Sequence, residues 1–332
     1  MSIRAKERLL NFLIILGVLA LLFVVGYPQY KESLPSKVKI GIDKSFSSLP
    51  FYVAKMDTSR NYFTIEKVEP EFIEITGDPL QGLKDGTFDM VAVPWYRLII
   101  SPGLNGDTVK SVCGIELKSG RVTDAIIVSP DSRMKNVKDL KGKNLGYMAA
   151  DEYLINLVFP GLEEDFKLTK VTLVPLQIED VPTAFTDKKV DAIYLLDPYR
   201  GYMVYKGNKV LFEGLISNYI MPSLPLAAIV MRQNYVKTEN RLAAIRMKNA
   251  VEATMSYLAR NPEAAKNFII KVNGWVSDGT LTLNIRIPEY QRLSEINVKN
   301  VERLQTELVQ RGIGTCGFKP TEFLFSKLDF RR

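Results

Sequence analysis

The chain of 332 residues contains no histidine. This absence removes Ser-His-Asp triads, His-based zinc sites and the side chain that most often acts as a general base near neutral pH. Only two cysteines, Cys113 and Cys316, could supply thiolates. Carboxylates and lysines can still catalyse, but the usual hydrolytic and zinc chemistries are excluded. We therefore expect no enzymatic activity, no metal site and no cofactor.

The sequence also lacks any block of Lys and Arg interleaved with aromatic residues. Its net charge is +7, yet five cations lie in the first 37 residues, which leaves the remainder only mildly basic. This pattern predicts no nucleic-acid partner. The 46% apolar and 24% charged residues are ordinary for a globular protein, and the length suggests two lobes at ~100–200 residues per domain.

An apolar run, Leu9–Tyr27, stands near the N-terminus and is interrupted only by Asn11. Its length is at the lower end of what spans a bilayer as a helix. Positive charges precede it, which predicts that residues 1–8 stay cytoplasmic and that the chain after residue ~30 emerges outside. We therefore interpret residues 9–27 as a transmembrane anchor and residues 28–36 as a short linker.

A cleaved signal peptide is the alternative interpretation of the same run, with Val24 and Gly26 as the small residues before the cut. No cysteine stands nearby to accept a lipid, which excludes a lipoprotein anchor. Both interpretations export the protein. An oxidising compartment permits a Cys113–Cys316 disulfide, but two separately buried thiols fit the sequence equally well.

A helix–turn–strand unit occurs twice, at Leu83–Val93 (LKDGTFDMVAV) and at Phe185–Leu195 (FTDKKVDAIYL). Each unit carries an Asp before a short apolar strand, and we interpret Asp89 and Asp191 as fixing the strand starts. A short apolar strand without alternation suits a parallel sheet covered on both faces. Two copies about 100 residues apart predict two similar α/β lobes.

Four segments resemble one group of solute-binding proteins: the strand Lys37–Ile42 with the following LPFYVAK helix, GTFDMVAV, VKDLKGKNLGY and KKVDAIYLLDPY. These proteins serve ABC importers for alkanesulfonates and taurine, nitrate or bicarbonate, and pyrimidine precursors of thiamine. The resemblance runs from about Val38 to about Tyr257. Where many members have a Trp-Glu-Pro turn, this chain has Leu196-Asp197-Pro198, so ligand identity does not transfer.

The resemblance implies the fold: α/β, a two-lobed type II periplasmic binding protein with two hinge crossings, preceded here by the transmembrane or signal helix. Lobe 1 would comprise residues 37–124 and 228–332, and lobe 2 residues 125–227. The crossings would fall at Thr123–Val128 and Pro225–Val230. The ligand would lie between the lobes.

Ligands in open α/β sheets bind outside the carboxyl ends of the strands. This rule selects loops whose helix N-termini suit an anion or a carbonyl and whose aromatic rings supply flat walls. Asp197 could accept from an amine or an aminopyrimidine. The same residues could instead cap helices, fill the core or brace the Pro198 turn. The candidate ligand-binding residues are Ser47, Ser48, Asp78, Trp95, Tyr96, Ala149, Tyr153, Asp197 and Tyr199.

These expectations describe an extracytoplasmic solute-binding protein of an ABC importer. It would close by hinge motion on a sulfonate, a pyrimidine vitamin precursor or a related oxyanion. Its partners would be this small molecule, the permease and ATPase subunits, and the membrane through the N-terminal helix. It would lie on the outer face of the cytoplasmic membrane, in the periplasm or outside the cell.

Two alternatives use the same fold. One is a membrane-tethered sensory receptor, which the cytoplasmic tail of about eight residues disfavours. The other is an enzyme of thiamine-pyrimidine or menaquinone synthesis. The pyrimidine-forming enzymes depend on a histidine and a cysteine-rich motif, and this chain has neither.

Overall fold

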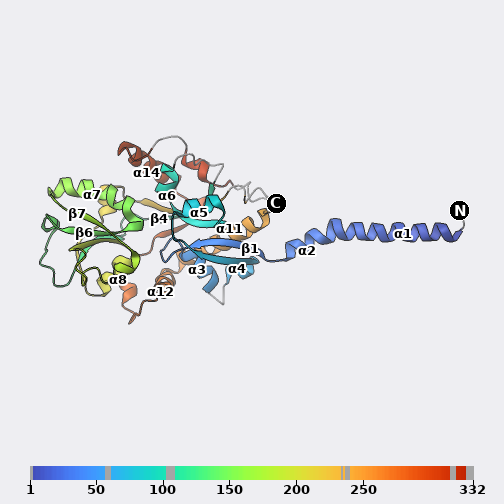
Figure 1. Cartoon of the computed structure of the whole chain (residues 1–332), viewed down its shortest axis with the longest axis horizontal. Coiled ribbons are helices and arrows are strands. Elements are labelled where there is room, and N and C mark those ends of the chain that lie inside the picture. Colours follow the sequence, from blue (N-terminus) through green and yellow to red (C-terminus); the bar gives the residue numbers. More distant parts are fainter. Residues whose placement is uncertain are drawn as a thin grey trace.

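Two separate β-sheets form the body of the protein. The computed structural model describes residues 3–56, 61–101, 109–232, 235, 240–314 and 319–326. Lobe 1 holds a six-stranded sheet in the order β11-β4-β10-β3-β1-β2, and lobe 2 a five-stranded sheet in the order β7-β6-β8-β5-β9. The strands that end the two repeated units, β3 (Met90–Pro94) and β8 (Ala192–Leu196), lie in different sheets. This arrangement confirms the predicted two-lobed α/β fold (Figure 1).

The sheet of lobe 1 is parallel where its first three strands meet and antiparallel on the other side of β3. Its other strands are β1 (Ser36–Ile42), β2 (Val68–Glu74), β4 (Val109–Leu117), β10 (Leu224–Arg232) and β11 (Glu289–Arg292). Its helices are α3 (Leu49–Met56), α4 (Tyr62–Ile65), α5 (Pro79–Asp85), α6 (Trp95–Ile100), α11 (Arg241–Arg260), α12 (Pro262–Val272), α13 (Leu281–Asn284) and α14 (Val298–Gln310).

The sheet of lobe 2 repeats this plan with a parallel half and an antiparallel half. Its other strands are β5 (Asp124–Val128), β6 (Asn144–Met148), β7 (Thr172–Leu176) and β9 (Lys209–Glu213). Its helices are α7 (Glu152–Phe166), α8 (Tyr199–Tyr205) and α9 (Leu215–Tyr219), and a 3-10 turn, η3 (Ala149–Asp151), precedes α7.

The two aspartates of the repeated unit do the same structural job in both lobes. Asp89 accepts from the backbone N–H of Lys39 at 2.9 Å, and Asp191 accepts from that of Asn144 at 2.9 Å. In return, the N–H of each aspartate donates to the carbonyl of the same partner residue. Each aspartate thus fixes the start of one parallel strand against its neighbour, as the sequence predicts.

The chain passes between the sheets in residues 118–123 and, after α9, in residues 220–223. The resemblance placed these crossings within Thr123–Val128 and Pro225–Val230, which is wrong. β5 pairs along its whole length with β8, and β10 pairs with β3 and β4, so neither strand is free to span two sheets. The N–H of Ser119 donates to the Ser223 hydroxyl at 3.0 Å, which joins the two crossings.

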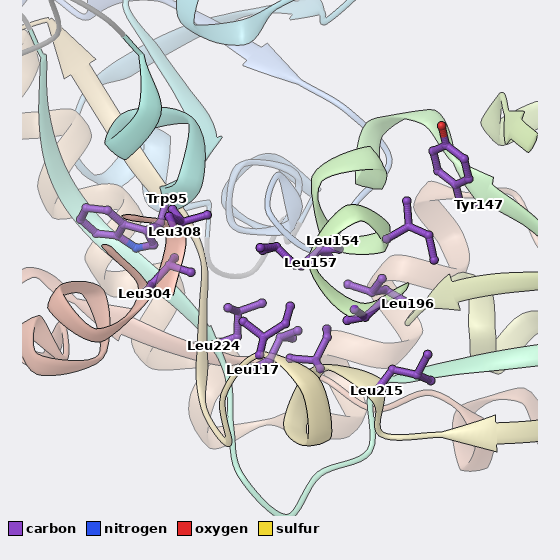
Figure 2. Packing of buried hydrophobic residues seen from close by; sticks show 14 of the residues in the cluster. Trp95, Leu117, Tyr147, Leu154, Leu157, Leu196, Leu215, Leu224, Leu304 and Leu308 are labelled. Carbon is purple, nitrogen blue, oxygen red and sulfur yellow. The ribbon is translucent and has the colours of Figure 1, made fainter. Parts of the chain in front are cut away.

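One apolar cluster extends through both lobes. Figure 2 shows Trp95 beside Leu304 and Leu308 of α14 in lobe 1, and it shows leucines of both lobes in the same cluster. Leu117 and Leu224 belong to it at the ends of the strands that lead to the crossings. Other buried residues form a second cluster around α11 in lobe 1 and a third behind the sheet of lobe 2.

The N-terminal segment projects away from lobe 1 as a long helix (Figure 1). It comprises α1 (Ile3–Leu21), a π-helical turn at Leu22–Gly26 and α2 (Tyr27–Ser33). The stretch Asn11–Ser33 has a mean hydropathy of 2.3 and buries none of its surface in the protein. It is long and apolar enough to cross a membrane, a criterion of length and composition that a signal sequence also meets.

The predicted linker, residues 28–36, is helical as far as Ser33, and β1 begins at Ser36. Pro28 stands in the first turn of α2, where its missing N–H costs little. The guanidinium of Arg246 then holds the end of this helix against lobe 1. It donates to the carbonyl oxygens of Glu32 at 2.5 Å and Leu34 at 2.8 Å, and to the Ser36 hydroxyl at 2.9 Å.

Candidate ligand site between the lobes

Loops at the strand ends of the two lobes meet around Tyr199, the first residue of α8. Its hydroxyl donates to Asn273 Oδ1 at 2.9 Å and lies 3.4 Å from the backbone oxygen of Lys44. The Asn273 amide donates to the same Lys44 oxygen at 3.2 Å. Lys44 follows β1, and Asn273 follows α12, so Tyr199 of lobe 2 contacts two segments of lobe 1. We call this contact region the interlobe face.

A pair of stacked tyrosines joins the lobes at a second place. Tyr96 lies in the first turn of α6 in lobe 1, and Tyr153 lies in the first turn of α7 in lobe 2. Their ring centroids are 3.5 Å apart and the planes differ by 14°. Burial raises the pKa of Tyr96 to about 12 and that of Tyr153 well above its usual value. The structure therefore brings together three of the predicted site residues: Tyr96, Tyr153 and Tyr199.

Trp275 adds a third aromatic contact, which the sequence analysis missed. It follows α12 and stacks on Tyr202, with ring centroids 4.3 Å apart. It also makes an edge-to-face contact with Tyr199, with ring centroids 5.4 Å apart. Trp275 is one of only two tryptophans in the chain. Its position just after an amphipathic helix was the available signal, but that signal does not say which lobe the ring faces.

Two aspartates that sequence reasoning also missed occupy this interface. Asp43 follows β1 in lobe 1, and Asp151 ends η3 after β6 in lobe 2. Asp43 is exposed and Asp151 is half-buried. Burial raises the pKa of Asp151, and the charge of Asp43 raises it further, to about 7. The charge of Asp43 in lobe 1 therefore acts on Asp151 in lobe 2.

Asp151 acts electrostatically on the tyrosines of the site. Its charge raises the pKa of Tyr96, Tyr153, Tyr194 and Tyr199, in each case after the larger effect of burial. In the described part of the chain, no protein group donates a hydrogen bond to the Asp151 carboxylate. Asp43, in contrast, accepts from the N–H and the hydroxyl of Ser45.

Trp95 does not lie at the interlobe face. Its side chain is 1% exposed and packs in the apolar cluster against α14 (Figure 2). An indole has more apolar surface than any other side chain, and burial in lobe 1 removes it from water. We therefore leave Trp95 out of the site.

Asp197 is buried, and its carboxylate is already bonded within the protein. It pairs with Arg200 at 3.0 Å, and it accepts from the N–H of Gly201 at 3.0 Å. These partners hold the turn at Pro198 and bond to both oxygens of the carboxylate. The prediction that it accepts from an amine is not supported by this geometry.

Asp78 and Ser48 also have structural partners. Asp78 caps α5 by accepting from the N–H of Leu80 and forms an ion pair with Arg97. Ser48 is fully buried, and its hydroxyl accepts from the N–H of Asp43 at 3.0 Å, which positions that carboxylate. The remaining two candidates, Ser47 and Ala149, are half-buried in the loops beside the interlobe face.

No group of three Cys, Asp or Glu side chains that could hold a metal ion occurs within the described ranges. Cys113 is a buried free thiol, whose pKa burial raises well above its usual value. Cys316 lies outside the described residues, so the pairing of the two cysteines stays a prediction.

Comparison with known proteins gives a family and a fold. The profile of the family "NMT1/THI5 like" matches residues 45–265. The "Putative aliphatic sulfonates-binding protein" of Bacillus subtilis (strain 168) is 26% identical over 210 residues, covering 60% of this chain and 58% of that protein. A protein of the same name from Escherichia coli (strain K12) is 27% identical over 207 residues, covering 60% and 61%. The chain thus matches less than two thirds of the length of either relative.

Solved structures share the fold at low identity. The alkanesulfonate-binding protein of Xanthomonas axonopodis pv. citri, bound to MOPS, matches with a TM-score of 0.65 at 16% identity, over 88% of this chain and 99% of that one. A ligand-binding component of an ABC-type import system from Staphylococcus aureus has a TM-score of 0.63 at 14% identity, over 89% and 98%. A desulfurization enzyme has a TM-score of 0.62 at 13% identity, over 89% and 97%, so the fold itself serves both binding and catalysis.

Proposed function

The chain belongs to the NMT1/THI5-like family, and on this premise we propose that it is the extracytoplasmic solute-binding component of an ABC importer. A small polar molecule binds between the lobes, and the lobes close on it. The observation that carries this proposal is the interlobe face. Aromatic rings and carboxylates from strand-end loops of both sheets meet there, at the edge where open α/β sheets bind ligands.

Closure transmits the signal only if the ligand binds the closed state better than the open one. Contacts that exist only between the lobes meet this condition. The Tyr96–Tyr153 stack and the Tyr199–Asn273 bond each use one residue from either lobe, so each forms when the lobes approach. The names of the relatives support a sulfonate as one ligand class, beside the pyrimidine precursors and other oxyanions expected from the sequence.

The N-terminal helix places this receptor at the membrane in the proposed function. As an uncleaved anchor, Asn11–Ser33 holds the lobes on the outer face of the cytoplasmic membrane, beside a permease and its ATPase. A tether raises the effective concentration of the receptor near that partner.

Mass spectrometry of the mature protein tests the anchor directly: detection of the N-terminal peptide supports it, and a mature chain that begins after residue 26 contradicts it.

We propose binding without catalysis. The chain has no histidine, and the groups at the interlobe face are carboxylates, phenols and an indole. Because a desulfurization enzyme has a similar fold, the absence of catalysis has to be measured. Incubation with a bound ligand and recovery of that ligand unchanged is the expected result, whereas turnover of the ligand contradicts the proposal.

Lobe closure is the central experiment. Fluorophores are attached at Lys84→Cys in lobe 1 and Glu164→Cys in lobe 2, both exposed positions, in a chain with Cys113→Ser and Cys316→Ser. A true ligand raises energy transfer as the lobes approach, and at 100 times its dissociation constant it stabilises the fold by ~2.7 kcal/mol.

The control pair, Glu164→Cys with Lys209→Cys, has both labels in lobe 2. The energy transfer between these two labels should not change when the ligand is added. Stabilisation without any change in energy transfer between the lobes would contradict hinge closure.

A further inference from the structure

We infer that Arg311 is a positioning residue that clamps the two lobes together and sets their separation in the free receptor. Its side chain provides a third connection between the lobes, in addition to the two crossings of the chain. The effect of this clamp on ligand binding rests on the proposed function, whereas the clamp itself is a property of the ligand-free chain.

Arg311 follows directly after α14, which packs against β10 and α6 of lobe 1. Its guanidinium bonds to two helices of lobe 2: Nη1 donates to the carbonyl oxygen of Leu157 in α7 at 2.5 Å, and Nη2 donates to that of Tyr219 in α9 at 2.5 Å. The carboxylate of Glu307, one turn earlier in α14, lies 3.7 Å from Nη2. An acid of lobe 1 therefore orients a guanidinium whose two carbonyl acceptors belong to lobe 2.

The backbone around Arg311 is fixed by the way α14 ends. Gly312 has a φ of +70°, which residues with a side chain rarely adopt. Its N–H donates to the carbonyl of Val309 at 3.0 Å, and the N–H of Ile313 donates to the carbonyl of Leu308 at 2.9 Å. This pair of bonds is the Schellman termination of a helix. Arg311, which precedes Gly312, thus has a defined position in lobe 1.

The two acceptors in lobe 2 are held together by the contact between α7 and α9. The ring of Tyr219 lies so close to Gly161 that a Cβ at that glycine would come within 2.6 Å of a ring carbon. The Tyr219 hydroxyl donates to Asp165 Oδ2 at 2.9 Å. Because Gly161 and Asp165 both belong to α7, the carbonyls of Leu157 and Tyr219 keep one relative position. Arg311 therefore joins two packed bodies and not two loops.

Arginine is the side chain that suits this position. Its planar guanidinium stays charged and carries five N–H donors in a rigid fork, so it can bond to carbonyls of two different helices at once. Tyr219 is the last residue of α9, and carbonyls at a helix end lack an intrahelical donor. A lysine keeps the charge but not the fork, so it should preserve only part of the clamp.

The clamp acts on the same helix as the tyrosine stack of the interlobe face. Tyr153 and Leu157 are four residues apart in α7, so they lie on one face of that helix. Tyr153 stacks on Tyr96 of α6, and α6 packs against α14, the helix that precedes Arg311. Bonding α7 to the end of α14 therefore keeps the two tyrosine rings within reach of each other.

The clamp should raise the fraction of the free receptor whose lobes are close enough to bind. The apparent affinity of a ligand falls in proportion to this fraction. Arg311 is not among the candidate ligand-binding residues, so it acts on binding through the separation of the lobes. Loss of the clamp should consequently weaken every ligand of the interlobe face by a similar factor, whatever its chemistry.

The first test needs no ligand. Energy transfer between Lys84→Cys and Glu164→Cys is measured in the full chain in detergent, in the labelling background used for lobe closure. Arg311→Ala should lower the energy transfer, because the lobes then separate further, and Arg311→Lys should give an intermediate value. Arg303→Ala removes a positive charge from an exposed position of α14 and should leave the energy transfer unchanged. The label pair within lobe 2 should give one value in all of these variants.

The second test measures binding of ethanesulfonate by titration calorimetry. Arg311→Ala should raise the dissociation constant roughly fivefold or more, because two hydrogen bonds of a charged group no longer hold the lobes together. Arg303→Ala should leave it unchanged. If ethanesulfonate does not bind to the wild-type chain, the sulfonate part of the proposed function fails, and the ligand-free measurement still decides the clamp.

Three outcomes overturn the inference. Equal energy transfer between the lobes in wild type and Arg311→Ala would show that the crossings and the apolar cluster alone set the separation. A fall in energy transfer within lobe 2 would show that Arg311 holds α7 and α9 together instead of joining the lobes. An unchanged affinity for ethanesulfonate in a variant whose lobes have separated would contradict the effect on binding.

Discussion

The carboxylate of Asp151 should cost the protein stability when it is ionised, because it is partly withdrawn from water and near the charge of Asp43. Its pKa is raised to about 7, against about 4 for a free aspartate, so the folded state binds more protons than the unfolded state between these values. Stability must therefore fall as the pH rises from 4 through 7.

We predict that Asp151→Asn stabilises the unliganded protein at pH 8, by about 1–2 kcal/mol, because the amide removes a poorly solvated charge that faces Asp43. The gain should be near zero at about pH 2–3, below both pKa values, where the carboxyl is protonated in both states. Chemical denaturation at the two pH values measures it, with Asp131→Asn as the control. A loss of stability at pH 8 would mean that Asp151 has a structural partner.

At the scale of elements, the junction between α2 and lobe 1 fixes the orientation of the N-terminal helix relative to lobe 1. Arg246, in α11, donates to two carbonyls at the end of α2 and to Ser36 at the start of β1. A cation at a helix C-terminus also favours the helix dipole. The N-terminal helix is therefore attached to lobe 1 by a hydrogen-bonded junction.

We predict that Arg246→Ala loosens this junction at a cost of roughly 1–3 kcal/mol, since it removes three hydrogen bonds from a buried charged group. Amide hydrogen exchange across residues 30–37 should become faster, while exchange in lobe 2 stays the same. Arg303→Ala, in α14, is the control. Unchanged exchange at residues 30–37 would show that Arg246 does not hold the helix.

At the scale of the whole molecule, the lobes are coupled by apolar packing as well as by the interlobe face. One cluster includes Trp95 and Leu304 of lobe 1 and Leu154, Leu157 and Leu196 of lobe 2 (Figure 2). Opening the hinge has to preserve most of this packing, because exposing it would cost about 25 cal/mol for each Å². We therefore place the moving contacts at the strand-end loops, away from the cluster.

This coupling predicts that the two lobes unfold together. Calorimetry of the unliganded chain should give one cooperative transition. Leu157→Ala should destabilise the chain by about 2–5 kcal/mol, because it opens a cavity in the shared cluster. The substitution should lower the unfolding temperature of both lobes together. Two separate transitions in the wild-type chain would contradict the coupling.

The sequence by itself determined the features that depend on neighbouring residues. The apolar run near the N-terminus and the two helix–turn–strand units follow from local periodicity, and the structure has both. The strand-start roles of Asp89 and Asp191 follow from their repeated position just before a strand, although each one bonds to a residue about 50 positions earlier in the chain. The helix α2, which continues through Pro28 to Ser33, is a local feature that the sequence analysis interpreted as part of a linker.

Only the tertiary structure decided which side chains lie between the lobes. Trp95 and Tyr96 are adjacent in sequence, yet one is buried against α14 and the other stacks on Tyr153 of the opposite lobe. Adjacent residues at the start of a helix point in directions about 100° apart, and which direction is buried depends on what a distant segment packs there. The local sequence around Asp43 or Asp151 does not show that the two carboxylates interact. Their interaction depends on the packing of two lobes whose strands lie far apart along the chain.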